Sequence, residues 1–435
     1  MKALNVWIVL VAFLLAGCAG TRTGQGQAVE IERLKVLDWD SDSFYSRYGN
    51  YFLYEFPQIR FEVVPLKQVY ASGSPPEQEQ ELARLVASEK PDLLFLNRMQ
   101  YRTLQANGDL FPLKSLLGDR VFESLHKGVF ELLKFYGGDE LYGVAASMNS
   151  SFLFYNRDLF DRYGIRLPDD QMDWEQFAWL AMRFPAGRTL GLYSPSPEPS
   201  SFLTNIGVSE GLSYLSPDKS KVTMNTDGWA EFAELLKSLY AGKTVNAWET
   251  PYSRENHPFL NGEAAMTFGD YGFYRLLEER NLPFAWGVMP LPGSDRTRSA
   301  IDLEQVVSVY KDSEKAETAA KLIEYMTGEK MTRMLERTKA SLSASLHASA
   351  AADAAHPFHF LYGRNANLGA IASYMNVSEM PDAFNAEFSA FYEDTIRKIV
   401  QDQIGVRDGL AEIEKFGNAL IANIPEPALD AGVRP

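Results

Sequence analysis

Three aspartates alternate at the end of an apolar run, a spacing that could begin a calcium-binding loop. Such a loop also needs glycine at its sixth position and glutamate at its twelfth. The aspartates are Asp38, Asp40 and Asp42, but the sixth and twelfth positions hold Ser43 and Gly49. A helix cap and contacts to a ligand explain these carboxylates better, and the sequence leaves open whether an ion binds them.

No other pattern predicts a metal centre, a cofactor or catalytic machinery. His356 and His359 are spaced like a pair of metal ligands, but no third histidine or cysteine lies near them in the sequence. The chain contains no phosphate-binding loop, no HExxH and no GxSxG, which mark nucleotide-binding proteins, zinc proteases and serine hydrolases. We therefore expect no metal ion, no cofactor and no catalytic residue.

The only cysteine, Cys18, is a candidate for lipidation. It follows Lys2, an apolar run over 6–15 and the small residues Ala16 and Gly17, the layout of a secretion signal. The run is too short to span a bilayer. Leu15-Ala16-Gly17-Cys18 resembles the bacterial lipobox, whose cysteine is acylated and becomes the first residue of the mature protein. We predict a signal peptide over 1–17, with an ordinary signal peptide and a chance cysteine as the alternative.

The segment 18–29 predicts a flexible tether, because it is rich in Gly, Gln and Thr and has no apolar periodicity. Lipid-anchored in this way, the protein would lie at the outer face of the bacterial cytoplasmic membrane. The formal net charge of −15 argues against binding to nucleic acid or to anionic lipid headgroups. With 435 residues, the chain is too long for one core, so we expect two large domains in a monomer.

Strands and helices alternate along the chain, which predicts an α/β fold with parallel strand pairing. Apolar runs predict strands over 34–37, 61–64, 93–96, 152–155, 189–193, 264–268, 285–289 and 306–310. Apolar residues at helical spacing predict helices over 44–56, 82–86, 174–181, 229–240 and 319–326, and a mostly helical end from about 344 that includes the alanine-rich 348–355. The helix at 229–240 should begin at a cap formed by 225–227, and the helix at 319–326 should end at Gly328.

Four segments together resemble one protein family. They are Leu141-Tyr142-Gly143-Val144 with the run from Phe154-Tyr155-Asn156-Arg157-Asp158-Leu159-Phe160 to Trp174, then Phe259-Leu260-Asn261-Gly262-Glu263-Ala264-Ala265-Met266, Trp286-Gly287-Val288-Met289-Pro290-Leu291-Pro292, and 319–326. In this order, behind a lipobox, they are similar to the extracellular solute-binding proteins of bacterial ABC importers, in the maltose-binding-like family that takes up sugars. The resemblance covers about 34–423. The chain departs from the family at 299–305, which lacks a glycine-rich stretch, and at 341–347, which lacks the usual proline and aromatic residue.

The resemblance implies a two-lobed periplasmic-binding-protein-like fold of class II, built from two doubly wound domains with a hinge. The chain should cross between lobes near 146–150 and again near 299–305. One lobe would then comprise 30–147 plus 303–342, and the other 148–302 plus 343–430. Such lobes close on a ligand.

Candidate ligand-binding residues follow the predicted strands, because ligands bind beyond the carboxyl ends of strands in open α/β sheets. Sugars lie on aromatic rings with their C–H faces and form hydrogen bonds through their hydroxyls. These residue types give Trp39, Asp40, Asn97, Arg98, Tyr193 and Trp248, and the resemblance adds Asn149, Asp270, Tyr271 and Glu304. For each residue the alternative is a helix cap, a core contact or a solvated surface position.

The resemblance implies a binding protein that captures a small molecule, a sugar or an oligosaccharide, and delivers it to ABC permease subunits in the membrane. A binder of a non-sugar solute, or a sensory co-receptor on the same fold, is one alternative. A secreted glycoside hydrolase or lyase is another. It would need two carboxylates at a defined separation, and no motif in the sequence fixes such a pair.

Overall fold

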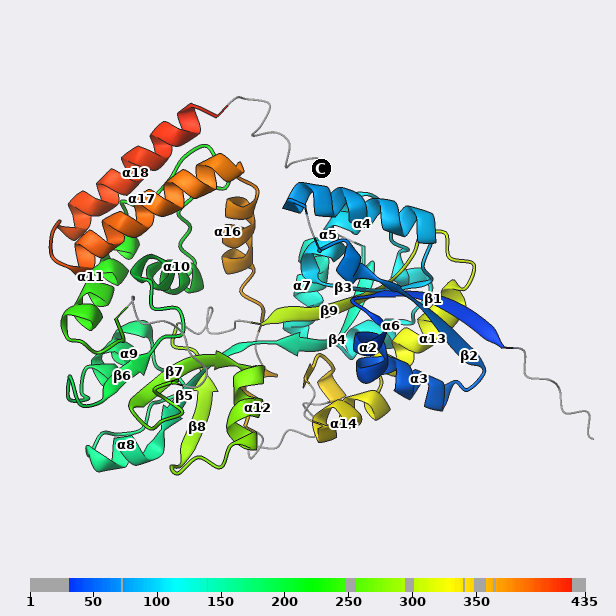
Figure 1. Cartoon of the computed structure of the whole chain (residues 1–435), viewed down its shortest axis with the longest axis horizontal. Helices are drawn as coiled ribbons and strands as arrows, with labels where there is room; N and C mark the ends of the chain where they lie inside the picture. The colour runs from blue at the N-terminus through cyan, green and yellow to red at the C-terminus, as the bar shows by residue number, and fades with distance from the viewer. Residues whose placement is uncertain are drawn as a thin grey trace, which may run out of the picture.

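Two lobes lie side by side and are joined by two long strands, β4 (Gly143–Asn149) and β9 (Asp302–Val309) (Figure 1). The computed structural model describes residues 31–71, 73–138, 140–247, 256–293, 301–338, 341–347, 357–362 and 365–424. Cys18, the signal peptide, the tether, Trp248 and the helix expected over 348–355 lie outside the described residues. The predicted lobe boundaries at 147/148 and 302/303 stay a prediction, since β4 and β9 run past them without a break.

The first lobe contains a six-stranded sheet of order β10-β4-β9-β3-β1-β2. Its remaining strands are β1 (Glu32–Asp38), β2 (Ile59–Pro65), β3 (Leu93–Leu96) and β10 (Leu342–Ser343). Strand β1 pairs in parallel with β2 and with β3, as the sequence predicts, whereas β9 runs antiparallel to β3 and β4 antiparallel to β9. Every residue of β3 is buried, which is the pattern of a strand covered on both faces.

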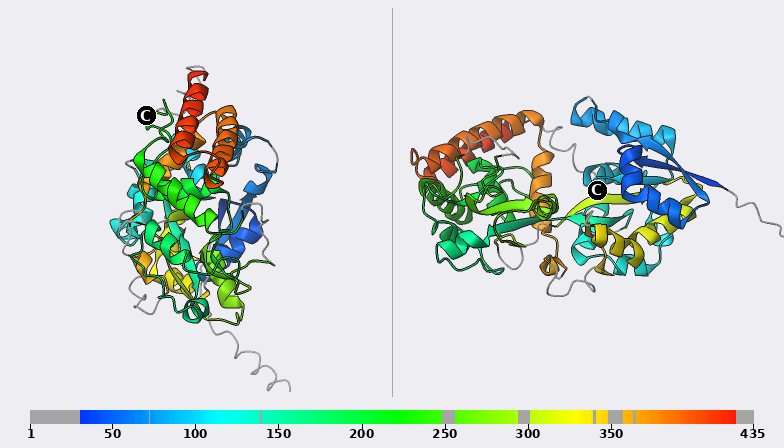
Figure 2. Two further views of the ribbon diagram at one scale, coloured as in Figure 1. Left: turned by 90° about the vertical axis from the view of Figure 1, so that its left-hand side faces the viewer. Right: turned by 60° about the horizontal axis from the view of Figure 1, so that its bottom comes forward.

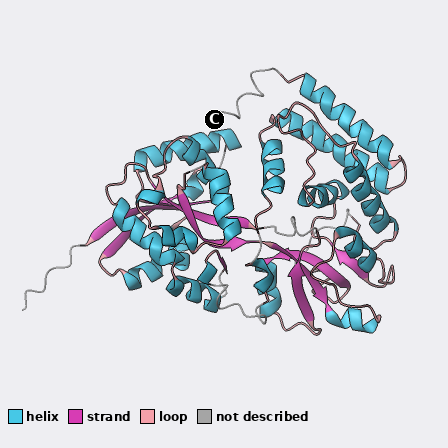
Figure 3. Ribbon diagram, turned by 180° about the vertical axis from the view of Figure 1, so that it is seen from behind, coloured by secondary structure: helices cyan, strands magenta, loops and turns pink. Residues whose placement is uncertain are grey.

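Helices cover both faces of this sheet (Figure 3). The helix expected over 44–56 is present as α2 (Ser41–Phe44), a π-helical turn (Tyr45–Gly49) and α3 (Asn50–Glu55), and it buries Phe44 and Phe52 completely. The other helices of this lobe are α4 (Pro75–Glu89), α5 (Arg98–Ala106), α6 (Asp119–Glu123), α7 (Lys127–Gly137), α13 (Ala316–Thr327) and α14 (Glu329–Thr338). Gly328 caps the end of α13, which confirms the predicted stop.

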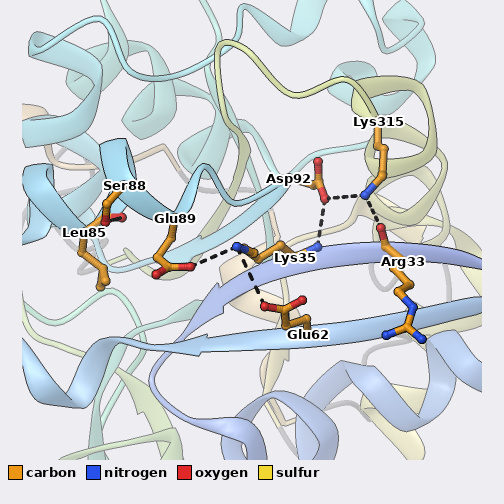
Figure 4. Close-up of polar contacts among 8 residues, drawn as sticks. All are labelled: Arg33, Lys35, Glu62, Leu85, Ser88, Glu89, Asp92 and Lys315. Atoms are coloured by element: carbon orange, nitrogen blue, oxygen red, sulfur yellow. Dashed lines mark hydrogen bonds and ion pairs between the residues drawn. The ribbon is translucent and has the colours of Figure 1, made fainter.

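A network of charged residues ties elements of the first lobe together: β1, β2, α4 and the segments just before β3 and α13 (Figure 4). Lys35 of β1 contacts Glu89 at 3.0 Å and Glu62 at 3.8 Å, and its backbone N–H donates to Asp92 at 2.9 Å. Lys315, just before α13, lies 3.5 Å from the same Asp92. The hydrogen bond to Glu89 contributes most to raising the pKa of Lys35. These pairs are partly exposed, so each adds little to the stability of the lobe.

The second lobe is built on a four-stranded mixed sheet of order β6-β7-β5-β8. Its strands are β5 (Ser151–Asn156), β6 (Leu190–Tyr193), β7 (Ala264–Asp270) and β8 (Trp286–Pro290). Its helices are α8 (Arg157–Arg162), α9 (Trp174–Ala181), α10 (Pro199–Ser209), α11 (Asp227–Ala241), α12 (Tyr271–Glu279), α16 (Leu368–Ser378), α17 (Asp382–Val400) and α18 (Val406–Ala422). Thr226 caps α11 through its side chain, as the sequence predicts.

The last two helices, α17 and α18, lie antiparallel on the outside of the second lobe (Figure 2). They pack against each other and, with α10 and α11, enclose a second hydrophobic core. Tyr214, Phe384, Phe388 and Tyr392 form a column of rings there, with neighbouring centroids 5.3–5.9 Å apart. Because these residues come from distant parts of the chain, the C-terminal helices complete the second lobe rather than extend it.

Candidate functional site

A cavity of about 810 Å³ lies between the two lobes, at the carboxyl ends of strands β3, β6 and β7. This volume falls within the roughly 300–1,000 Å³ typical of small-molecule sites. The first lobe contributes Arg98, the chain at the start of the joining strand β9 contributes Ile301 and Asp302, and the second lobe contributes most of the remaining wall. Both lobes therefore contact whatever fills it.

Aromatic side chains form one wall of the cavity. Trp174, at the start of α9, and Phe202, in α10, each lie 6.0 Å from Phe268 of β7, measured between ring centroids. The indole N–H of Trp174 donates to the hydroxyl of Ser209 at 3.0 Å, which fixes the orientation of the ring. Such rings suit the apolar C–H faces of a ligand that has hydroxyl groups at its edges.

Polar side chains lie at the ends of the strands and helices around the cavity. Asp270 ends β7 and caps α12, with its Oδ1 accepting the backbone N–H of Phe273 at 3.0 Å. Arg98 begins α5 and forms an ion pair with Asp302 of β9. These carboxylate and guanidinium groups come from three different elements, so a ligand could form hydrogen bonds to both lobes at once.

His257 also lines the cavity and is uncharged at neutral pH. Burial lowers its pKa to about 4, and the nearby Arg280 acts in the same direction. Its ring lies edge-on to Tyr193 at 4.4 Å and stacks on Phe273 at 5.1 Å. The imidazole therefore offers the ligand a neutral, largely apolar surface.

A smaller recess of about 180 Å³ lies on the first lobe, between the π-helical turn, α14 and strands β4 and β9. Glu304 lines this recess and its side chain is in contact with solvent. The surrounding protein nevertheless removes part of the hydration of the carboxylate, and this desolvation raises the pKa of Glu304. Asp38 is buried beside Arg47, whose Nη2 lies 2.8 Å from its Oδ1. Among the described residues, Asp38 Oδ2 and Gln305 Oε1 have no hydrogen-bond partner.

The structure brings some of the sequence-predicted site residues to these cavities. Arg98 and Asp270 line the larger cavity, and Glu304 lines the recess. Trp39 and Asn97 lie at the same edge of the first sheet. Trp39 stacks on Tyr70 at 6.2 Å between centroids, Tyr70 accepts a hydrogen bond from Gln100 at 2.9 Å, and Gln100 bonds the backbone N–H of Asn97 at 2.8 Å.

Other predicted residues have local structural roles. Asp40 caps α2 and lies 3.5 Å from Lys67, and Asn97 caps α5. The side chain of Asn149 accepts the backbone N–H of Ser150. Tyr271 packs against Tyr274 and Phe358 and is not part of the larger cavity wall. A ligand-binding role for each of these residues stays a prediction.

Sequence reasoning missed the parts of the wall supplied by helices. Asn205 and Ser209 come from α10, and Asn367 and Tyr374 from the start and middle of α16; no local signal in the sequence sets these positions apart. Phe268 could have been found, since it lies two residues before Asp270 on the same strand and side chains two apart share a face.

Within the ranges that the structure covers, no group of three or more His, Cys, Asp or Glu side chains could hold a metal ion. Among these same residues, no helix has the length and hydropathy needed to cross a membrane.

Several known proteins are similar to this chain in sequence. Proteins of Brucella abortus (strain 2308) and Brucella suis biovar 1 (strain 1330), described as binding proteins, are each 23% identical over an alignment of 246 residues that covers 51% of this chain. The chain spans 58% of the length of these curated relatives.

Solved structures share the fold at low sequence identity. An ABC substrate-binding protein of Listeria monocytogenes, in complex with cycloalternan, is 18% identical with a TM-score of 0.58, over 90% of this chain and 100% of that one. The sugar-binding protein MalE of Xanthomonas citri is 16% identical with a TM-score of 0.65, over 90% and 97%. The GacH receptor of Streptomyces glaucescens, solved with acarbose, is 15% identical with a TM-score of 0.60, over 91% and 99%. The two-lobed periplasmic-binding-protein-like fold is thus confirmed.

Residues 68–357 match the family described as bacterial extracellular solute-binding protein. The match covers more than half of the chain and includes β3 to β9 and most of the cavity wall. This match shows that the chain belongs to the bacterial extracellular solute-binding proteins.

Proposed function

We propose that this protein captures a sugar or an oligosaccharide between its lobes and presents it, unaltered, to the permease of an ABC importer. The observation that carries the proposal is the 810 Å³ cavity, which combines the rings of Trp174, Phe202 and Phe268 with the polar groups of Arg98 and Asp270. Rings for C–H faces and charged groups for hydroxyls are the two kinds of contact that carbohydrates need. The carbohydrate complexes of the Listeria and Streptomyces proteins support the same ligand class.

Closure of the lobes provides the signal in this proposal. A ligand that contacts Arg98 in one lobe and Asp270 in the other stabilises the closed state in proportion to its differential affinity for that state. The permease then recognises the closed pair of lobes, and the protein acts as a monomer. We propose that Trp39, which is exposed at the edge of the first sheet, extends the contact for a longer oligosaccharide.

A ligand panel tests this function. The purified protein is mixed with maltose, maltotriose, cycloalternan and acarbose, and with amino acids and peptides as the non-sugar arm, while melting temperature and product formation are followed. A ligand at one hundred times its Kd should add about 2.7 kcal/mol of stability and be recovered uncleaved. If only the amino acids or peptides stabilise the protein, its ligand is not a sugar. If a sugar is cleaved, the protein is a glycoside hydrolase or lyase rather than a binding protein.

The anchor forms a separate part of the proposal. We propose that Cys18 is acylated and that residues 18–29 tether the lobes to the outer face of the cytoplasmic membrane, on the basis of the lipobox-like Leu15-Ala16-Gly17-Cys18. Metabolic labelling with a fatty acid should mark the wild-type protein and leave Cys18→Ser unlabelled. An unlabelled wild-type protein would remove the anchor and leave the ligand proposal intact.

A further inference from the structure

Helix α16 lies between the lobes and contacts both (Figure 1). It forms part of the cavity wall through Asn367, Ala370, Ile371 and Tyr374. Two hydrogen bonds join it to α10 of the second lobe: Asn367 Nδ2 donates to the backbone oxygen of Ser209 at 3.0 Å, and the Tyr374 hydroxyl donates to Asn205 Oδ1 at 2.7 Å. These bonds attach α16 to the second lobe along its length.

Contacts at the two ends of α16 reach the first lobe. Just before the helix, the backbone N–H of Ala366 donates to Glu131 of α7 at 3.2 Å. At its other end, Glu379, the C-cap residue, forms an ion pair with Arg102 of α5. Arg102 lies one turn beyond Arg98 on the same helix, so both guanidinium groups extend from one face of α5.

The carboxylate of Glu379 is shared between two cations. Arg102 contacts its Oε1, and Lys219 of the second lobe lies 2.9 Å from its Oε2. The three side chains are 27% (Arg102), 17% (Glu379) and 8% (Lys219) exposed. Burial acts to raise the pKa of Glu379, but the hydrogen bonds from Lys219 and Arg102 outweigh it and the pKa is lowered. The carboxylate is therefore charged at neutral pH and little screened by salt.

The backbone around Lys219 holds this lysine in place. Lys219 has a left-handed conformation with φ of 58°, which is uncommon for a residue with a side chain and persists where the surroundings enforce it. Its N–H donates to the backbone oxygen of Ser216 at 2.8 Å in a tight turn. Glu379 thus keeps a fixed partner inside its own lobe, whereas Arg102 is its partner across the cleft.

We propose that Arg102 is a positioning residue that latches α16 to the first lobe and thereby holds the cavity closed around its ligand. The inference rests on the proposed function, since it concerns retention of the ligand in that cavity. The ion pair lies at the end of α16, next to α5, and removing Arg102 leaves Glu379 neutralised by Lys219. Loss of the latch should therefore release the C-terminal end of α16 from the first lobe without leaving a buried charge unpaired.

The test compares Arg102→Gln with wild type by hydrogen exchange in the ligand-free full chain. Amides of α16 should exchange about fivefold faster in the variant, which corresponds to loss of a partly exposed ion pair, while α17 and α18 stay unchanged. Arg102→Lys should restore most of the protection. Arg84→Gln is the matched control, because Arg84 pairs with Glu81 at 3.5 Å within α4, and it should have no effect on α16. Unchanged exchange in Arg102→Gln would overturn the latch.

Dissociation of maltotriose, measured by stopped flow, supplies a second readout. Arg102→Gln should release it about fivefold faster with little change in the association rate, because an open cleft still admits ligand. An equal rate of release would overturn the role in retention. If maltotriose and the rest of the panel fail to bind, the sugar assignment falls, while the exchange of α16 still decides the latch.

Discussion

Asp270 caps a helix, and we propose that it also binds the ligand; two substitutions separate these roles. Its side chain caps the nine-residue helix α12 and lines the cavity. Asp270→Ala removes both functions, whereas Asp270→Asn keeps the cap, because Asn and Asp are equally good at this position. We expect Asp270→Ala to lose about 1 kcal/mol of stability from the missing cap, which lowers the melting temperature of a lobe by about 2–4 °C. Asp270→Asn should melt within about 1 °C of wild type on the same reasoning.

The affinity for the ligand should report the proposed ligand-binding role of Asp270. A hydrogen bond from a ligand hydroxyl to a charged group contributes about 1.5–3 kcal/mol, so both variants should weaken binding roughly ten- to hundredfold in Kd. Scanning calorimetry measures the melting temperature, and titration calorimetry with the ligand from the panel measures the Kd. A melting temperature that falls equally in both variants would refute the cap argument. An unchanged Kd in both would remove Asp270 from the site.

Three further predictions concern titration and packing. Because burial lowers the folded-state pKa of His257 from 6.5 to about 4, the unfolded chain takes up this proton first as the pH falls. The free energy of unfolding should therefore decrease by about 1.4 kcal/mol for each unit by which the pH drops between these values. Urea titrations at several pH values should show a weaker pH dependence of this free energy for His257→Gln than for wild type. Glu304 has a raised pKa, so its ionisation opposes folding above that pKa; Glu304→Gln should be more stable than wild type at pH 7, and the difference should vanish as the pH falls below the model-compound value of 4.5. A Cβ at Gly207 would lie 2.1 Å from the ring of buried Trp229, so Gly207→Ala should cost about 1–3 kcal/mol in the same titrations, and a neutral substitution would contradict the packing described.

Local signals predicted the strands and several caps correctly. The segments 34–37 and 93–96 lie in β1 and β3. All of β3 is buried, and a strand buried on both faces shows as a short continuous apolar run. Asn97 and Asp270 end strands and start helices, which is why they could be chosen from sequence. Ring orientation was less predictable: Tyr271, adjacent to Asp270, turns toward Phe358, from a segment almost ninety residues later in the chain.

The amino-acid sequence by itself determined the class of the fold and the positions where strands give way to polar residues, because these follow from periodicity and turn chemistry within short segments. The resemblance to the family came from four longer segments of the sequence in a fixed order. The tertiary structure alone decided which of those positions face one another. Arg98 meets Asp302 from 204 residues away, and Arg102 meets Glu379 from 277 residues away. Neither pair leaves a local pattern, since the direction of a side chain is set by the element that packs against it. The energy of such a pair exists only once the two elements that carry it have packed together.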